Sequence, residues 1–208
     1  MTKLDPIKKQ FRAFACLSTC ALALTAFAFS SASEVMAGGG VSPAKPQPAE
    51  AMLKPGLAVQ YYGSKFNSIR ELVEWMDYDK GKAGIVIPML NYQVGAGNVL
   101  TATSNDLVGA DITGFINLKK AGSYSFMVHS NDGVRVTIGG KMIYEDPDVH
   151  ADRFSDEIKL EISEPGWYPV RVLYFEKKNT STLELYWDLP GPEEMDYVPA
   201  DAFSHIGK

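Results

Sequence analysis

Short stretches in which apolar and polar residues alternate cover much of the C-terminal three quarters of the chain. In residues 122–130, Tyr124, Phe126 and Val128 share one face, and smaller or polar residues occupy most of the other. Successive side chains of a strand point to opposite faces, so each such stretch predicts a strand with one buried side. The same alternation recurs in 57–62, 134–138, 158–162, 168–174 and 183–187.

Turn-forming residues separate these stretches at short intervals. They are Ala121-Gly122, Asn131-Asp132-Gly133, Gly139-Gly140, Glu164-Pro165-Gly166 and Pro190-Gly191-Pro192. Short alternating strands with frequent turns predict an all-β sandwich or barrel. Only Ser68–Tyr78 has helical periodicity, with one apolar stripe, and we expect this short helix to pack at the edge of a sheet.

The N-terminus has the order of charge and hydrophobicity typical of a secretory signal peptide. Four basic residues precede or overlap the start of an apolar stretch from Phe11 to Phe29, and small residues follow it. This order predicts a signal peptide over residues 1–37, cleaved after Ala32 or Ala37. The alternative is a retained membrane anchor. Polar residues interrupt the apolar stretch, which favours cleavage and a mature protein without a membrane span.

Both cysteines, Cys16 and Cys20, lie inside the predicted signal peptide. The mature chain would therefore contain no cysteine, and about 150 residues can bury an adequate core without disulfides. Residues 17–20 also resemble a lipidation motif, so a lipoprotein attached through Cys20 is an alternative. Thr19 is a poor residue before a lipidated cysteine, and the apolar stretch continues well beyond it.

Residues 38–55 are rich in glycine, proline and alanine and have few large apolar side chains. This composition predicts a disordered linker, followed by a folded domain over 56–208. Without residues 1–37 the chain has 16 basic and 23 acidic side chains, a net charge of −7. Such a surface repels phosphate backbones, so nucleic acid is excluded as an expected partner.

Four separated segments resemble the protective-antigen domain family, which includes flocculin and adhesin-type lectin domains. They are 112–143, 166–176 together with 183–187, the opening 56–62 and the closing 198–203. The resemblance implies a two-sheet antiparallel β-sandwich, jelly-roll-like, with one short helix. Several members of the family bind terminal sugars through a calcium ion, whereas others serve as packing or processing modules. Fold alone does not decide between these roles.

The resemblance also implies a set of calcium ligands. In sugar-binding members, two adjacent acidic residues joined by a cis peptide bond chelate the ion, and the matching pair here is Asn131-Asp132. The first position has changed from Asp to Asn. The loop after the Trp-Tyr-Pro strand supplies a side-chain oxygen and two carbonyls, which correspond to Glu176, Lys178 and Thr180. Glu176 would restore the negative charge lost at Asn131.

Simpler interpretations exist for the same residues. Asn-Asp-Gly between two strands is a strong β-hairpin signal that needs no ion, and the loop after Glu176 fits an ordinary solvated loop. His129 lies beside the turn, where it joins Asp132 and Glu176 as a candidate sugar contact, or is a plain surface histidine. Trp187 shares the apolar face of its strand and is expected in the core.

Two function classes follow from these observations. The first is a calcium-assisted carbohydrate-binding module that recognises extracellular glycans. The second is a structural or protein-interaction module that binds cell-surface proteins without sugar binding. An enzyme is not expected, because we find no nucleophile–base pair, metal cluster or phosphate-binding loop in the sequence. Export predicts a periplasmic, cell-surface or extracellular location.

Overall fold

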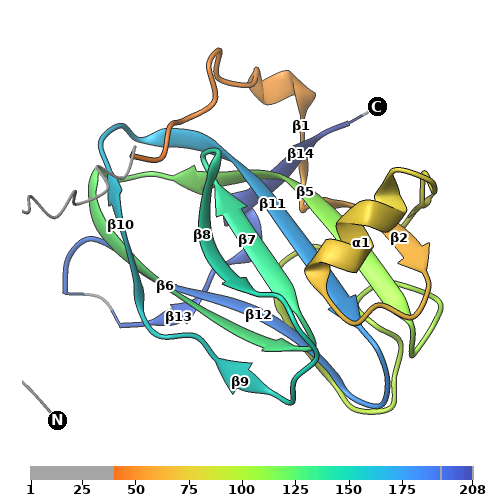
Figure 1. Ribbon diagram of the computed structural model, residues 1–208. Coiled ribbons are helices and arrows are strands. Elements are labelled where there is room, and N and C mark those ends of the chain that lie inside the picture. Colours follow the sequence, from red (N-terminus) through yellow and green to blue (C-terminus); the bar gives the residue numbers. More distant parts are fainter. Residues whose placement is uncertain (1–39, 193, 208) are drawn as a thin grey trace, which may run out of the picture. The chain divides into compact units, whose positions relative to one another are not determined.

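The computed structural model describes residues 40–192 and 194–207, and the signal peptide expected over 1–37 lies outside them. The fold consists of two antiparallel sheets (Figure 1). The larger, eight-stranded sheet contains β1 (Leu53–Pro55), β2 (Ala58–Gly63), β3 (Lys82–Ala83), β5 (Val108–Leu118), β7 (Val134–Ile138), β8 (Lys141–Asp146), β11 (Gly166–Glu176) and β14 (Phe203–Ile206).

The smaller, six-stranded sheet contains β4 (Asn91–Val94), β6 (Gly122–Asn131), β9 (Arg153–Phe154), β10 (Ile158–Ile162), β12 (Ser181–Asp188) and β13 (Asp196–Tyr197). Its main path runs β10-β6-β12-β13, and the larger sheet runs β1-β14-β5-β11-β7-β8. Every strand pairing is antiparallel, which confirms the predicted two-sheet β-sandwich.

The core lies between the two sheets and is built by the alternation seen in the sequence. Tyr124, Phe126 and Val128 of β6 pack with Leu183 and Leu185 of β12 and with inward residues of the larger sheet. Trp187 is half-buried and packs against this core, as expected from its place on β12. The turn predicted at residues 139–140 joins β7 to β8, and both of its glycines have positive φ, as a tight hairpin turn requires.

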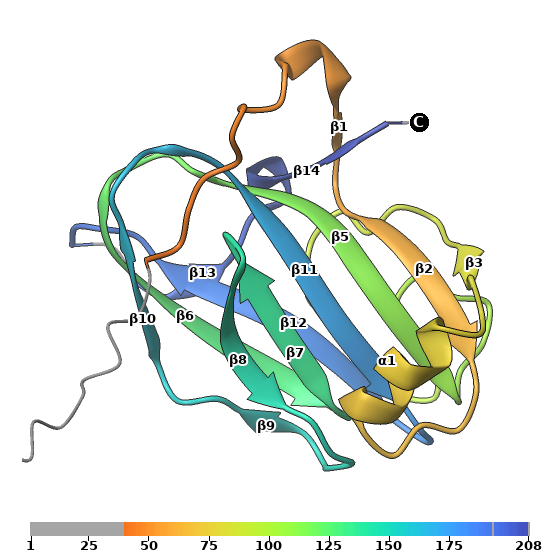
Figure 2. The same ribbon diagram turned by 45° about the horizontal axis from the view of Figure 1, so that its top comes forward.

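The helix α1 (Ile69–Met76) covers the outer face of the larger sheet rather than its edge (Figure 2). The Ser68 side chain caps it by accepting a hydrogen bond from the Glu71 amide. Ile69 and Leu72 are fully buried and pack, with Phe66, on the outward side chains of β2 and β11. The predicted packing at the edge is therefore wrong, because β2 and β11 present large apolar residues on both faces.

The disordered linker predicted over 38–55 is wrong for residues 40–55, which are ordered against the domain. Val41 is buried, the Ala44 amide donates to the Trp167 carbonyl, and Gln47 bonds to the backbone of Trp167. A short 3-10 helix, η1 (Glu50–Met52), leads into β1, which pairs with β14. Composition predicts poor intrinsic order, but the edges of a finished sheet supply hydrogen-bond partners that a free linker lacks.

A second 3-10 helix, η2 (Ala200–Ala202), precedes β14. Within residues 40–192 and 194–207, no helix is both long and apolar enough to cross a lipid bilayer.

Candidate functional site

The candidate site lies where β6, β7 and β11 end close together at one end of the sandwich. The Asn131–Asp132 peptide bond is cis. The strands on either side of this turn belong to different sheets, because β6 pairs with β10 and β12 whereas β7 pairs with β11 and β8. The alternative interpretation as a β-hairpin is therefore wrong, and residues 131–133 form a crossover from one sheet to the other.

Close packing fixes this crossover. The Tyr174 hydroxyl donates a hydrogen bond to the Asn131 carbonyl from inside the core. Gly133 is required for steric reasons, since a Cβ at this position would lie 2.4 Å from a ring carbon of Phe175 and 2.9 Å from the Pro147 carbonyl oxygen. Contacts with Tyr174, Phe175 and Pro147 therefore fix the turn without the help of a ligand.

Asp132 is buried and tied to two neighbouring loops. Its Oδ1 accepts a hydrogen bond from the His150 amide at 3.1 Å, and its Oδ2 accepts one from the Lys177 amide at 2.9 Å. Lys177 directly follows Glu176, so the structure brings Asp132 and the end of β11 together, as the family resemblance implies. Each Asp132 oxygen has a further lone pair available.

Glu176 is fully buried, with 0% of its surface exposed, and neither of its carboxylate oxygens has a hydrogen-bond partner. Burial raises the pKa of Glu176 to about 7, and the nearby carboxylates of Asp106 and Asp132 add to the rise. A buried carboxylate without a partner is costly in its charged form, which makes this side chain the most unusual polar group of the site.

Sequence reasoning missed Asp106, which comes from the loop between β4 and β5. Its Oδ1 accepts a hydrogen bond from the Asn179 amide at 2.7 Å and thereby anchors the loop after β11. Asn179 has a φ of 78°, a left-handed conformation that asparagine tolerates. The sequence signal for Asp106 was weak, because this loop has no periodicity and no motif in it resembles a ligand set.

The remaining predicted ligands fall in the loop between β11 and β12. Thr180 accepts a hydrogen bond on its hydroxyl from the Asn131 side-chain amide at 3.0 Å, and the same amide lies 3.5 Å from an Asp152 carboxylate oxygen. Lys178 is exposed in this loop. In the described part of the chain, no three His, Cys, Asp or Glu side chains are placed to hold a metal ion by themselves. A cation here would need amide and carbonyl oxygens as well.

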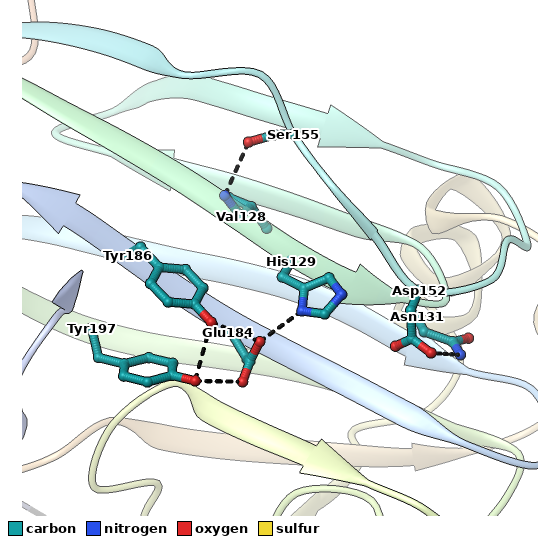
Figure 3. Close-up of polar contacts among 8 residues, drawn as sticks. All are labelled: Val128, His129, Asn131, Asp152, Ser155, Glu184, Tyr186 and Tyr197. Carbon is teal, nitrogen blue, oxygen red and sulfur yellow. Dashed lines mark hydrogen bonds and ion pairs between the residues drawn. The ribbon is translucent and has the colours of Figure 1, made fainter. Parts of the chain in front are cut away.

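His129 is not the surface histidine that the sequence allowed for. Its side chain is buried, and Nδ1 lies 2.6 Å from Glu184 Oε2, which is buried too (Figure 3). The Phe154 ring stacks on the imidazole with ring centroids 3.9 Å apart. The His129 side chain therefore lies on the outer face of the smaller sheet. Asn131, two residues further along β6, is the next residue on that face.

Comparison with known proteins places the chain in a family. A sequence profile described as the PA14 domain matches residues 53–199. No curated protein matches the chain in a sequence comparison.

Several solved structures have a similar fold. The PA14 domain of the antifreeze protein MpAFP has a TM-score of 0.64 at 17% identity, covering 78% of this chain and 95% of that one. The PA14 sugar-binding domain from an RTX adhesin has a TM-score of 0.57 at 17% identity, covering 73% and 98%. The epithelial adhesin 9 A domain from Candida glabrata, in complex with Galβ1-4GlcNAc, has 0.58 at 13%, covering 77% and 93%.

At these identities the structural matches show a common fold. The profile match covers residues 53–199, most of the chain, and a solved PA14 domain shares the fold of this chain. This chain belongs to the PA14 domain family.

Proposed function

We propose that this protein is a carbohydrate-binding module that acts outside the cell or at the cell surface and uses Ca²⁺ to bind its sugar. The observation that carries the proposal is Glu176, a fully buried carboxylate whose two oxygens have no hydrogen-bond partner. It lies beside Asp132 and Asp106, which raise its pKa in addition to the effect of burial. A cation that binds oxygen ligands would offset the charge of this buried carboxylate and of its acidic neighbours, with amide and carbonyl oxygens completing the ligand set.

The donor set suits calcium. Carboxylate, amide and carbonyl oxygens are the ligands that this hard cation prefers, and it accepts irregular arrangements of them. We propose Asn131, Asp132 and Glu176 as side-chain ligands and Lys178 and Thr180 as carbonyl ligands. The Asn131 side chain would turn its oxygen to the ion, while Asp106 holds the loop of Asn179 in place. The site then keeps its negative charge although one aspartate of the family pattern is asparagine.

When bound, the ion would accept two vicinal sugar hydroxyls, with Asp132 accepting a hydrogen bond from one of them. Support comes from the structural neighbours, since one is named a sugar-binding domain of an adhesin and another is a complex with Galβ1-4GlcNAc. The same neighbours are adhesin domains, which supports an extracellular or cell-surface location and a binding role without catalysis.

Thermal unfolding tests the cation site. Millimolar calcium should raise the unfolding temperature of the wild type, because a ligand that binds only the native state stabilises it by mass action. Asp132→Ala should abolish the shift and Glu176→Gln should weaken it strongly. The exposed Glu161→Gln is the matched control and should respond as the wild type does. Equal unfolding temperatures of the wild type in calcium and in chelator would refute the cation site.

A glycan array tests the sugar. Multivalently displayed protein should bind a subset of terminal glycans in millimolar calcium and lose that binding in chelator, and multivalency is needed because single-site sugar affinity is weak. Binding that survives chelation would separate the lectin function from the ion. A blank array in both conditions would refute carbohydrate binding.

A protein-interaction module is the second candidate, and one surface favours it. Large apolar side chains are exposed around α1 and β3, among them Trp75, Tyr78, Ile85 and Leu107. Patches of this kind mark contact surfaces in many soluble proteins. If the array is blank, these residues are the first to replace in a search for a protein partner.

A further inference from the structure

The outer face of the smaller sheet has a row of three aromatic side chains that the sandwich core does not use. Phe154 of β9, Tyr186 of β12 and Tyr197 of β13 form this row, which we call the aromatic strip. The ring centroids of Phe154 and Tyr186 are 6.0 Å apart, and those of Tyr186 and Tyr197 are 4.5 Å apart and stacked. Tyr186 alternates with the buried Leu185 on β12, so its ring lies on the side of the sheet away from the core.

A buried carboxylate holds the two tyrosine rings in place. Glu184 is buried on the same outer face and is bonded by three groups: His129 Nδ1 at 2.6 Å, the Tyr197 hydroxyl at 2.9 Å and the Tyr186 hydroxyl at 3.0 Å (Figure 3). Burial raises the pKa of Tyr186, and its hydrogen bonds to Tyr197 and Glu184 add to the rise, so the hydroxyl stays protonated. Rings fixed in this way lose little conformational entropy when a ligand binds.

Phe154 is the open end of the strip. One face of its ring covers His129, with the two ring planes 10° from parallel. The side chain is nevertheless 52% exposed, which leaves ring surface free for a ligand. One ring face thus covers the buried His129–Glu184 pair, and the rest of the side chain lies outside the sandwich core.

The strip begins where the candidate cation site ends. His129, beneath Phe154, and Asn131 are two residues apart on β6, so their side chains share the outer face and are about 7 Å apart along the strand. Asp152 precedes β9 by one residue and lies 3.5 Å from the Asn131 side-chain nitrogen (Figure 3). A chain of sugars that starts at the cation site can therefore continue over Phe154 without leaving the surface.

We propose that the aromatic strip is an extended glycan subsite that binds the sugar units following the one held at the cation site, and this proposal rests on the proposed function. A pyranose ring has an apolar face of C–H groups and hydroxyls at its edge, which is the shape that a flat aromatic face recognises. The ligand class is accordingly an oligosaccharide, of which the cation site binds the terminal unit.

The experiment compares glycans of different length on the full protein. An array that carries paired mono- and oligosaccharides with the same terminal unit, Galβ1-4GlcNAc and galactose among them, is probed in millimolar calcium. Phe154→Ala should weaken binding of the oligosaccharides about three- to tenfold, the range of one aromatic stacking contact. Binding of the paired monosaccharides and the calcium-induced rise in unfolding temperature should stay unchanged. Phe154→Trp should retain oligosaccharide binding.

Tyr78→Ala is the matched control, since Tyr78 is a more exposed aromatic residue that follows α1 on the opposite sheet. It should bind every glycan as the wild type does. Equal oligosaccharide binding by wild type and Phe154→Ala would overturn the strip while leaving the cation site intact. Equal losses for mono- and oligosaccharides, or a lost calcium response in Phe154→Ala, would also overturn it by making Phe154 a support of the cation site. A wild type that binds no glycan would refute the proposed function itself.

Discussion

At the scale of single residues, the site depends on how a few buried polar atoms are paired. Asp132 has a backbone amide on each carboxylate oxygen, whereas Glu176 has no hydrogen-bond partner on either. Both acids are therefore buried, but only the carboxylate of Asp132 is hydrogen-bonded. The Asn131 side-chain amide donates hydrogen bonds to Thr180 and Asp152, so Asn131 stabilises the loops as well as being a candidate ligand.

The pKa of Glu176 predicts how stability depends on pH in the cation-free protein. Its pKa is raised from 4.5 to about 7, so the folded protein keeps a proton that the unfolded chain releases between these values. Stability should be full below the lower value, fall as the pH rises through this window, and level off above it. A pKa difference of this size corresponds to about 3 kcal/mol.

Urea unfolding in chelator, at about pH 5 and about pH 8, measures this loss. In Glu176→Gln the contribution of this side chain should vanish and the two free energies of unfolding should come closer together. The exposed Glu161→Gln should behave as the wild type. Identical pH dependence in wild type and Glu176→Gln would contradict the prediction.

Asn131→Asp should shift stability in opposite directions with and without calcium. The new carboxylate has no N–H to donate to Thr180 and faces the Asp152 carboxylate, so the cation-free protein should be about 1–2 kcal/mol less stable. Calcium should offset this loss, because the variant has the acidic pair of the family pattern. Thermal melts in calcium and in chelator test both halves, with the exposed Asn98→Asp as control. A variant that is destabilised equally in both conditions would contradict a ligand role for residue 131.

At the scale of elements, the sequence predicted strands best where the alternating face is made of large residues. β6, β7, β10 and all but the first residues of β12 were found in this way, because each has three large apolar residues in phase. β5 is the longest strand together with β11, yet Ala110 and Gly114 occupy its buried face and weaken the pattern. The two-residue strands β3, β9 and β13 are too short for any periodicity, and only their pairing partners define them.

The candidate site, too, could be predicted only where a local sequence motif marks it. The turn at residues 131–133 could be identified from a motif, but its interpretation as a hairpin was wrong. Two strands that are adjacent in sequence can join different sheets, and the sequence does not reveal which sheet each strand joins. Asp106 and the partners of His129 could not be predicted, because they meet the site through loops and through strands far apart in the chain.

Gly133→Ala tests the crossover as an element. The added Cβ would lie 2.4 Å from the Phe175 ring, and the ring is buried under α1, so relief requires movement of a packed layer. We expect a loss of about 1–3 kcal/mol in the free energy of unfolding and a weaker calcium response. Gly95→Ala is the matched control, as nothing lies within 4 Å of its Cβ position. Equal stability of the two variants, measured by urea unfolding, would contradict the close packing of the turn.

At the scale of the whole molecule, the predicted export of a chain without disulfides has a direct consequence. Both cysteines, Cys16 and Cys20, lie in the predicted signal peptide, so a chain that begins at Gly38 contains none. Its unfolding temperature should be the same with and without reductant, because it has no thiol to form a disulfide and buries an adequate core without one. A drop of several degrees on reduction would contradict this.

The ordered segment at residues 40–55 predicts that the domain is larger than its composition indicates. A chain that begins at Gly56 would lose β1 from the edge beside β14, the bonds to Trp167, and the burial of Val41. Burial of one valine side chain contributes about 1.5–3 kcal/mol, so the shorter chain should be less stable by at least that range. Urea unfolding of the chains that begin at Gly38 and at Gly56 measures the difference, and Val41→Ala in the longer chain should account for part of it. Because the segment contacts the end of the sandwich opposite the cation site, the shorter chain should retain its calcium response. Equal free energies of unfolding for the two chains would return residues 40–55 to the role of a linker.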